Sequence, residues 1–378
     1  MADVLGGRAL NRALLERQWL SARRDAGAVG PVAAMEHLAG MQAQAGDAPY
    51  YQLHARLDGF TPRALSDALT DRAAARVVLM RGTIHLVSAR DVLPMRTVVQ
   101  PFLDTVLFHS TAGKQVAGVD PAAVTAAARE VLADGPLANE ELGERLAGRL
   151  PGYEGNALAY LARCLLPLVQ VPPRGVWGQG GGLVYALAEQ WLDVEAGTGR
   201  AADPATDATP DDLVLRYLAA FGPASVADAQ KWSSLTGLRA VFERLRPRLV
   251  SYRDEAGREL FDLAGTELPD PGREIEPFLL GPFDNALLSH ADRSRIIAKE
   301  YERKVFTHNG IVRGAIMLDG FVAGLWKPVL KRREATVEFT AFRTFTRAER
   351  AALEQRAAEL LEFAAPETER RRTVFTEP

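Results

Sequence analysis

The sequence contains a single cysteine, Cys164, among its 378 residues. One cysteine cannot form a disulfide within the chain, so the core has to stabilise the fold, as suits a reducing compartment. Cys164 lies in the largely apolar stretch 161–168, and we expect a buried thiol rather than a reactive one. The chain is long enough for two or three domains of ordinary size.

Several enzyme signatures are also missing. The six histidines show no paired spacing with cysteine or carboxylate residues, so the sequence predicts neither a zinc nor an iron site. The glycine-rich stretch 178–182 is not followed by the Lys-Ser/Thr of a phosphate-binding loop, and no nucleophile elbow occurs. We expect no metal and no cofactor.

Long apolar runs and a strong charge of one sign are absent as well. No run approaches a membrane span and the N-terminus lacks a signal pattern, so we expect a cytoplasmic, nucleoid-associated protein without membrane contact. The formal net charge of -3 argues, if anything, against a nucleic-acid partner. However, this charge is a sum over the whole chain. A basic concave face balanced by an acidic outer face would give the same total.

What the chain does contain is a repeated order of elements. Helices are predicted at 8–18, from Pro31, and from Pro62, followed by a hairpin over 75–89. Helices and a hairpin recur over 121–186 and over 211–262, with a Gly-Pro turn after the first helix of each. In these copies Asn139, Asn156, Ser225 and Thr236 are the predicted helix caps. This order of helices followed by a hairpin predicts three winged-helix units.

The C-terminal part changes character. Apolar runs at 311–318 and 321–326 flank Asp319-Gly320, an alternating strand is predicted over 335–342, and Thr346 caps a closing helix over 347–363. The predicted fold class is therefore α+β, with three tandem winged-helix units and a C-terminal β-sheet domain. We place the domains at 1–115, 116–200, 205–270 and 271–378, with a linker at 197–209.

Gln42 and Gln44 stand where an apolar helical run gives way to a loop. Residues two apart lie on one face only in extended backbone, where two amides could hold one small object such as a water molecule. Helix amphipathicity does not explain the pair, although a polar helix end whose amides satisfy nearby backbone groups would.

Basic residues cluster where wings and loops would meet a duplex. Any one of them could be a solvated surface charge, but as a set they suggest phosphate contacts, which position a protein without reading sequence. The candidates are Arg174 beside Trp177, the group Arg293, Arg295, Arg303 and Lys304, and the group Lys327, Lys331, Arg332 and Arg333.

Four separated blocks closely resemble the AlkZ/YcaQ family of bacterial winged-helix DNA glycosylases. They are GMQAQA at 40–45, MRGTIHLV at 80–87, VPPRGVWG at 171–178 and GPFDN at 281–285. The resemblance runs over essentially the whole chain. It implies a C-shaped protein around double-stranded DNA that excises N7-alkylated purines, including one side of an interstrand crosslink.

The family's catalytic motif is glutamine, apolar residue, glutamine in the AlkZ branch, and aspartate replaces the second glutamine in the YcaQ branch. Gln42, Ala43 and Gln44 match the former, so the resemblance implies that both glutamines are catalytic. An N7-alkylated purine is already a cationic leaving group, and what remains is to position water and to stabilise positive charge. Gln44 in place of aspartate suggests selectivity for such cationic lesions, and we expect no deep base pocket beside the motif.

Five further residues are candidate neighbours of the active site. Arg81, Thr83 and His85 alternate along a predicted strand and so share a face, although they could equally form a structural network. Asp47 and Tyr50, which follow the motif, are ambiguous in the same way. No lysine occurs in the motif block, so a Schiff-base lyase is not suggested.

Two other functions fit parts of the pattern. A non-catalytic tandem winged-helix regulator would need recognition helices with exposed base-reading residues, and the apolar helix predicted over 157–168 offers few. A protein-interaction scaffold would show no salt-dependent affinity for DNA. We expect a monomeric glycosylase, and the sequence leaves open which adduct it removes and whether it serves general repair or antibiotic self-resistance.

Overall fold

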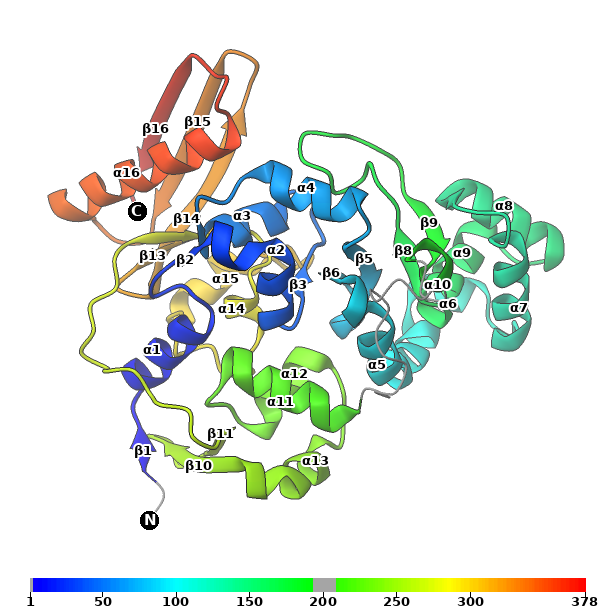
Figure 1. Ribbon diagram of the computed structural model, residues 1–378, viewed down its shortest axis with the longest axis horizontal. Helices are drawn as coiled ribbons and strands as arrows, with labels where there is room; N and C mark the ends of the chain where they lie inside the picture. Colours follow the sequence, from blue (N-terminus) through cyan, green and yellow to red (C-terminus); the bar gives the residue numbers. More distant parts are fainter. Residues whose placement is uncertain (1–2, 193–208) are drawn as a thin grey trace.

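The computed structural model describes residues 3–192 and 209–378. Three segments in it repeat one order of elements: helix, short strand, two helices and two antiparallel strands, as a winged helix requires (Figure 1). In the first segment these are α2 (Ala26–His37), β3 (Met41–Gln42), α3 (Ala48–His54), α4 (Pro62–Thr70), β5 (Ala74–Val78) and β6 (Ile84–Ser88).

The second and third segments follow the same order. The second contains α7 (Pro121–Val131), β7 (Leu137–Ala138), α8 (Asn139–Arg149), α9 (Gly155–Leu165), β8 (Leu168–Gln170) and β9 (Val184–Leu187). The third contains α11 (Pro210–Phe221), α12 (Val226–Ser233), α13 (Leu238–Leu245), β10 (Leu249–Asp254) and β11 (Glu259–Leu263), and the single residue Ala224 takes the place of its short strand.

The short strand pairs antiparallel with the last strand in every copy. Met41 lies opposite Leu86, and Leu137 lies opposite Tyr185. In the third copy, Ala224 forms an isolated bridge to Phe261. The two-glutamine motif therefore begins in the short strand of the first copy, where one edge of the backbone is fixed by its neighbour in the sheet.

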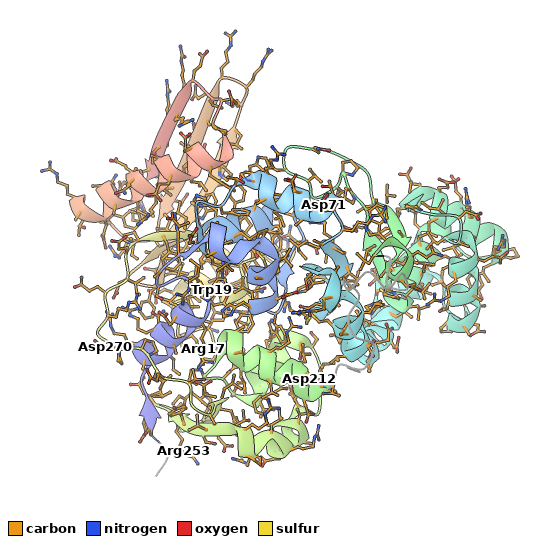
Figure 2. The ribbon with its side chains drawn as sticks, in the orientation of Figure 1. Arg17, Trp19, Asp71, Asp212, Arg253 and Asp270 are labelled. Atoms are coloured by element: carbon orange, nitrogen blue, oxygen red, sulfur yellow. The ribbon has the colours of Figure 1, made fainter. Side chains whose placement is uncertain are left out.

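The three segments are joined in two ways. Strands β5 and β8 pair antiparallel, which merges the first two segments into one sheet of order β3-β6-β5-β8-β9-β7. The third segment is held by the N-terminus: β1 (Val4–Leu5) runs parallel to β10, and α1 (Gly7–Arg17) packs beside it. Arg17, labelled in Figure 2, pairs with Asp262 of β11 (Nη2–Oδ2 2.6 Å) and donates to the carbonyl of Leu218 (2.6 Å).

The C-terminal part forms a sheet of its own, which extends away from the body (Figure 1). Its order is β12-β13-β14-β15-β16. The strands and the helix that packs on them are β12 (Phe278–Leu280), β13 (Ala315–Leu318), β14 (Phe321–Leu330), β15 (Glu334–Ala341), β16 (Arg370–Thr376) and α16 (Arg347–Ala364).

Further elements connect these parts. They are β2 (Arg24–Asp25), β4 (Leu57–Asp58), the 3-10 turn η1 (Met80–Gly82), α5 (Ala89–His109), α6 (Thr111–Gln115), α10 (Ala188–Trp191), α14 (Asn285–Leu288) and α15 (Glu302–Val305). Among the described residues, no helix is long and apolar enough to cross a membrane.

The predicted α+β class is confirmed, and so are several local expectations. Ser225 and Thr346 cap α12 and α16 through full capping boxes with Asp228 and Glu349. Cys164 is buried, as predicted. The predicted domain boundaries and the C shape stay predictions, and all of the predicted linker 197–209 except Thr209 lies outside the described residues.

The helix predicted to run from Pro31 to the glutamines is too long. It ends at His37, and two residues with positive φ, Ala39 (φ 53°) and Gly40 (φ 86°), turn the chain into β3. A Cβ on Gly40 would lie 2.8 Å from Cγ1 of Val87, so both the conformation and the space favour glycine. Gln42 therefore lies in extended backbone, whereas Gln44 lies in the bend that follows the strand.

Three predicted caps are wrong. Asn139 and Asn156 lie inside α8 and α9, and Gly237 rather than Thr236 caps α13. Glu154 caps α9 by accepting a backbone N–H of its first turn (3.2 Å). The long helix α5, and β16 parallel to β15, were not predicted.

The cores show which parts depend on one another. One large core contains side chains from the first and third segments and from the C-terminal part, among them Tyr50, Trp232 and Phe283. The second segment has a largely separate core around Leu158 and Leu161. The body around the motif therefore folds as one unit built from distant parts of the sequence.

Arg56 and Asp284 form a bidentate ion pair inside that body (2.7 and 2.8 Å), with side chains 1% and 0% exposed. The variant Asp284→Ala leaves the Arg56 guanidinium buried without its partner, so we expect the free energy of unfolding to fall by about 3–5 kcal/mol. Urea denaturation measures this. The control is Asp67→Ala, whose partner Arg63 is exposed, and which should cost less than about 0.5 kcal/mol. Equal losses in the two variants would refute the prediction.

Candidate active site

The two glutamines are only two residues apart in the sequence, but their side chains lie in different environments. Gln42 ends β3 opposite His85 of β6 and is only 5% exposed. The backbone N–H of Ala43 still donates to the carbonyl of Ile84 (2.8 Å), which keeps the chain extended beyond the strand. Gln44 follows in a bend and is exposed. One glutamine is therefore held within the protein and the other reaches solvent.

Arg81 holds the side chain of Gln42. Its Nη2 donates to Oε1 of Gln42 (2.7 Å) and lies 3.2 Å from Nε2 of His85, and its Nη1 donates to the carbonyl of Trp232 in α12 (2.6 Å). Arg81 adopts a left-handed conformation (φ 58°) in η1 between β5 and β6, and this turn directs the backbone toward the motif. The site thus combines the first and third segments.

The charges of this group follow from burial. His85 is fully buried, and burial together with the Arg81 charge lowers its pKa to about 3, so the imidazole is neutral at pH 7. Its Nδ1 lies 3.0 Å from the carbonyl of Thr83 and must be the protonated nitrogen, which leaves Nε2 as an acceptor for Arg81. Burial and the charge of Arg293 lower the pKa of Arg81 to about 10, so Arg81 remains a cation.

Three side chains from other parts of the chain donate hydrogen bonds to backbone carbonyls of the motif. Asn285 Nδ2 donates to the carbonyl of Gly40 (2.6 Å), Gln52 Nε2 donates to that of Gln42 (3.1 Å), and Arg76 Nη2 donates to that of Ala43 (2.8 Å). We call these three side chains the carbonyl clamp. Each is buried, so water does not compete for the carbonyls.

Further contacts fix the clamp itself. Gln52 Nε2 also donates to the carbonyl of Pro282 (2.9 Å), while Arg56 donates to the carbonyl of Gln52 (2.9 Å) and pairs with Asp284. Arg76 Nε donates to Oε1 of Gln170 (3.1 Å). The blocks at 40–45 and 281–285 are therefore parts of one site.

Gln52, Arg56 and Arg76 were not predicted as site residues from the sequence. A signal was present, because Gln52 and Arg56 lie one helical turn apart among apolar neighbours, and Arg76 interrupts a buried strand. A polar side chain on a buried face has to find partners inside the protein. That rule identifies such residues but does not name their partners.

The other predicted neighbours differ in position. Thr83 is half-buried and donates to the carbonyl of Met80 (3.2 Å), and Asp47 is exposed in the bend after the motif. The hydroxyl of Tyr50 is buried and donates to the carbonyl of Gly175 (2.7 Å), and a role for Tyr50 beside the site stays a prediction. Tyr50 holds the 171–178 loop against α3.

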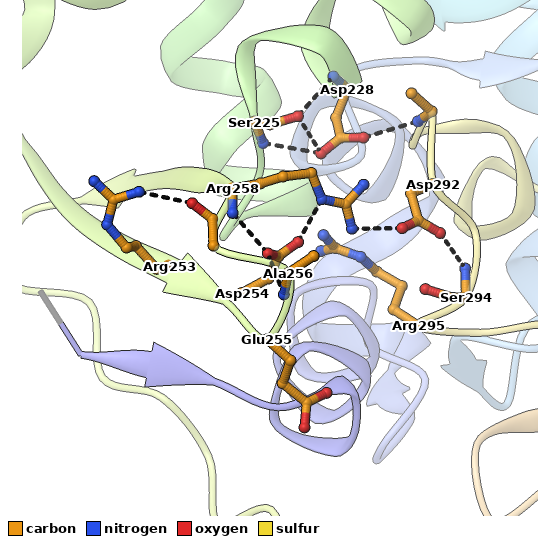
Figure 3. Close-up of polar contacts among 12 residues, drawn as sticks. Ser225, Asp228, Arg253, Asp254, Glu255, Ala256, Arg258, Asp292, Ser294 and Arg295 are labelled. Carbon is orange, nitrogen blue, oxygen red and sulfur yellow. Dashed lines mark hydrogen bonds and ion pairs between the residues drawn. The ribbon is translucent and has the colours of Figure 1, made fainter.

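One of the predicted DNA contacts needs correction. Arg295 is 5% exposed, and its guanidinium donates to the carbonyl of Pro223 (2.8 Å) close to Asp228 and to the Arg258–Asp292 ion pair, so it is not a surface contact for a phosphate (Figure 3). The Trp177 ring is half-buried and packs against Tyr50 and Tyr51 (centroids 4.9 and 5.6 Å apart), and its role in DNA binding stays a prediction.

The remaining basic residues stay candidates. Arg174 and Arg293 are half-buried, and Arg293 lies over the ring of Phe306 (4.2 Å to its centroid). The exposed members are Arg303, Lys304, Lys327, Lys331, Arg332 and Arg333. Lys327 already pairs with Glu338 (2.8 Å).

A cavity of about 870 Å³ lies between the α3–α4 connection and α16. Its lining includes His54, Phe60 and Phe363 but neither glutamine. Burial lowers the pKa of His54 to about 4.

Within residues 3–192 and 209–378, no three His, Cys, Asp or Glu side chains come together in a group that could hold a metal ion.

A family model described as DNA glycosylase AlkZ-like matches residues 35–363. The chain belongs to this family. The match spans the motif strand, the clamp and the C-terminal sheet up to β15, and it confirms the family predicted from the four sequence blocks. The protein is therefore an enzyme of the DNA glycosylase class.

A curated relative and a solved structure, both from Streptomyces sahachiroi, are similar to most of this chain. A curated relative from Streptomyces sahachiroi, the "Interstrand DNA cross-link repair glycosylase", is 25% identical over 334 residues, which are 83% of this chain and 86% of the relative. The solved structure of Streptomyces sahachiroi DNA glycosylase AlkZ has a TM-score of 0.78 at 21% identity, covering 99% of this chain and 100% of that one. It has the same fold.

We predict that acid destabilises the protein through its buried histidines. The pKa of His85 is lowered to about 3 in the folded state, so between pH 6.5 and pH 3 the unfolded chain binds the proton more tightly. The contribution of neutral His85 to the free energy of unfolding is therefore complete above pH 6.5. It falls as the pH is lowered toward 3, by up to about 1.4 kcal/mol per pH unit.

Urea denaturation between pH 7 and pH 4 tests this. His85→Asn should show a shallower loss of stability than the wild type, and His308→Asn, at an exposed position, is the control. Equal slopes in the wild type and His85→Asn would contradict a neutral, buried His85.

Proposed function

We propose that this glycosylase hydrolyses the N-glycosidic bond of N7-alkylated purines in double-stranded DNA, including the unhooking of interstrand crosslinks. Gln42 and Gln44 position the water that attacks the sugar. The observation that carries the proposal is the pair of neighbouring amides, Gln42 at the end of β3 and Gln44 in the bend that follows. The backbone carbonyls of Gly40, Gln42 and Ala43 beside them are bound by the carbonyl clamp. Rigid support of this kind is what a water-positioning site requires.

The reaction balances without an acid or a base from the protein. The bond between C1′ and the purine nitrogen breaks, and its electron pair neutralises the positive charge of the N7-alkylated base. The sugar passes through an oxocarbenium-like state, and the water oxygen forms the new bond to C1′. The excess proton leaves to bulk solvent, because an amide is too weak a base to keep it.

The protonation states favour this substrate class. A neutral base leaves slowly unless an acid protonates it, and His85, with a pKa of about 3, is a neutral imidazole at pH 7 and too weak an acid for that role. Arg81 does not release its protons at this pH either. A base that is already cationic needs neither residue as an acid.

The crosslink assignment rests on the curated relative, whose printed name states interstrand crosslink repair. A crosslinked base is tethered to the opposite strand and cannot swing fully out of the duplex, so a deep base pocket would be of little use. We propose that the enzyme reaches the sugar from an open surface and acts as a monomer. Family membership weighs against the regulator alternative.

Single-turnover excision from duplex DNA with one N7-methylguanine tests the proposal. We expect the wild type to release the base, and Gln42→Ala and Gln44→Ala each to lose roughly 100-fold or more in rate while still binding the duplex. Gln355→Ala, an exposed glutamine on α16, is the matched control and should keep the wild-type rate.

Substrate selectivity is tested with the same duplex carrying a neutral damaged base. Release of the neutral base as fast as N7-methylguanine would refute the requirement for a cationic leaving group. A wild type that binds duplex but releases nothing would favour the regulator.

A further inference from the structure

The two glutamines are not chemically equivalent in this fold. A glutamine amide has one accepting end, Oε1, and one donating end, Nε2, whereas a guanidinium can only donate. Gln42 can therefore face Arg81 with Oε1 alone, and the 2.7 Å contact is between these groups. The second hydrogen of Arg81 Nη2 is directed to Nε2 of His85, which accepts because its Nδ1 carries the proton.

This contact fixes the other end of the amide. With Oε1 held by a cation, Nε2 of Gln42 must point away from Arg81. Among the described residues, this nitrogen has no hydrogen-bond partner, and it is not among the fully buried polar atoms that lack one. The end of Gln42 left for substrate or water is a donor.

Gln44 is in the opposite situation. Its side chain is exposed, and its Oε1 receives only a long contact from the backbone N–H of Ile84 (3.3 Å). A bond at that distance is weak and restrains the amide little. Gln44 can therefore turn its carbonyl oxygen toward a ligand, which Gln42 cannot do without leaving Arg81.

We propose that Arg81 is a positioning residue that divides the work of the two glutamines, with Gln42 acting as a hydrogen-bond donor and Gln44 as the acceptor. The assignment rests on the proposed hydrolysis. The water accepts a hydrogen bond from Nε2 of Gln42 and donates one to Oε1 of Gln44. Its remaining lone pair is free to form the bond to C1′, and one of its protons leaves to solvent as before.

The first test compares two near-isosteric variants, Gln42→Glu and Gln44→Glu, in single-turnover excision of N7-methylguanine from a duplex. A carboxylate at 42 pairs with Arg81 but offers no N–H, so we expect a rate loss of roughly 100-fold. A carboxylate at 44 is still an acceptor, so we expect that variant to stay within about tenfold of the wild type. Thermal unfolding and duplex affinity show that both variants fold and bind.

The second test asks whether Arg81 acts through Gln42. Arg81→Met should slow excision in the wild-type background and in the Gln44→Ala background, but should add little to the loss already caused by Gln42→Ala. Arg81→Lys, which keeps a cationic donor, should recover part of the rate. A merely structural Arg81 would lower the rate by the same factor in every background.

The outcomes separate the two claims. Equal losses in Gln42→Glu and Gln44→Glu, or a faster Gln42→Glu, overturn the division of roles while leaving the glycosylase activity in place. Additive effects of Arg81→Met and Gln42→Ala overturn the role of Arg81. No release of base by the wild type overturns the proposed function and the division of roles together.

Discussion

The backbone of the motif strand depends on hydrogen bonds that the sheet does not supply. Strand β3 has two residues and lies at the end of its sheet, so only one edge pairs with β6. The carbonyls of Gly40 and Gln42, two residues apart, are bound instead by Asn285 and Gln52. A short edge strand cannot hold its own orientation, and buried carbonyls need partners. The clamp meets both needs.

The clamp also explains why distant parts of the chain occur together in this site. Its members come from α3, β5 and the segment after β12, and Arg81 adds a contact to α12 of the third segment. The shared core of these parts positions the clamp, and the Arg56–Asp284 ion pair fixes its C-terminal member. The second segment has a largely separate core and contacts the site through Gln170, which holds Arg76.

Electrostatics limit the chemistry that such a site can perform. Its polar groups are two amides, a neutral imidazole and a guanidinium, and none of them exchanges protons near pH 7. A site of this kind can orient a water molecule but cannot assist a poor leaving group. The proposed restriction to cationic bases follows from this composition.

The sequence predicted what depends on local pattern. The winged-helix element order, the Ser225 and Thr346 caps and the extended conformation at Gln42 are local features. Helix periodicity, capping chemistry and residue spacing can each be recognised within a few positions of the sequence. The burial of Arg295 was not predicted. Its partners lie far away in the sequence, and a list of basic residues does not show which are paired inside the protein.

In the site as well, the sequence predicted the residues that a local pattern marks and missed those that act through long-range contacts. Gln42 and Gln44 stood out by spacing and by family resemblance, whereas Gln52 and Arg76 act through backbone carbonyls and have no motif of their own. The roles of His85 and Arg81 depend on burial and on each other's charge. Such properties arise only when the tertiary structure brings the groups together.

The most direct measurement is a crystal structure of the enzyme bound to duplex DNA that carries a cationic azasugar in place of the damaged nucleoside. The account predicts an ordered water that accepts from Nε2 of Gln42 and donates to Oε1 of Gln44, with Oε1 of Gln42 still on Arg81. A complex in which Gln42 turns its Oε1 from Arg81 to the water, or in which the azasugar lies away from both glutamines, would contradict it.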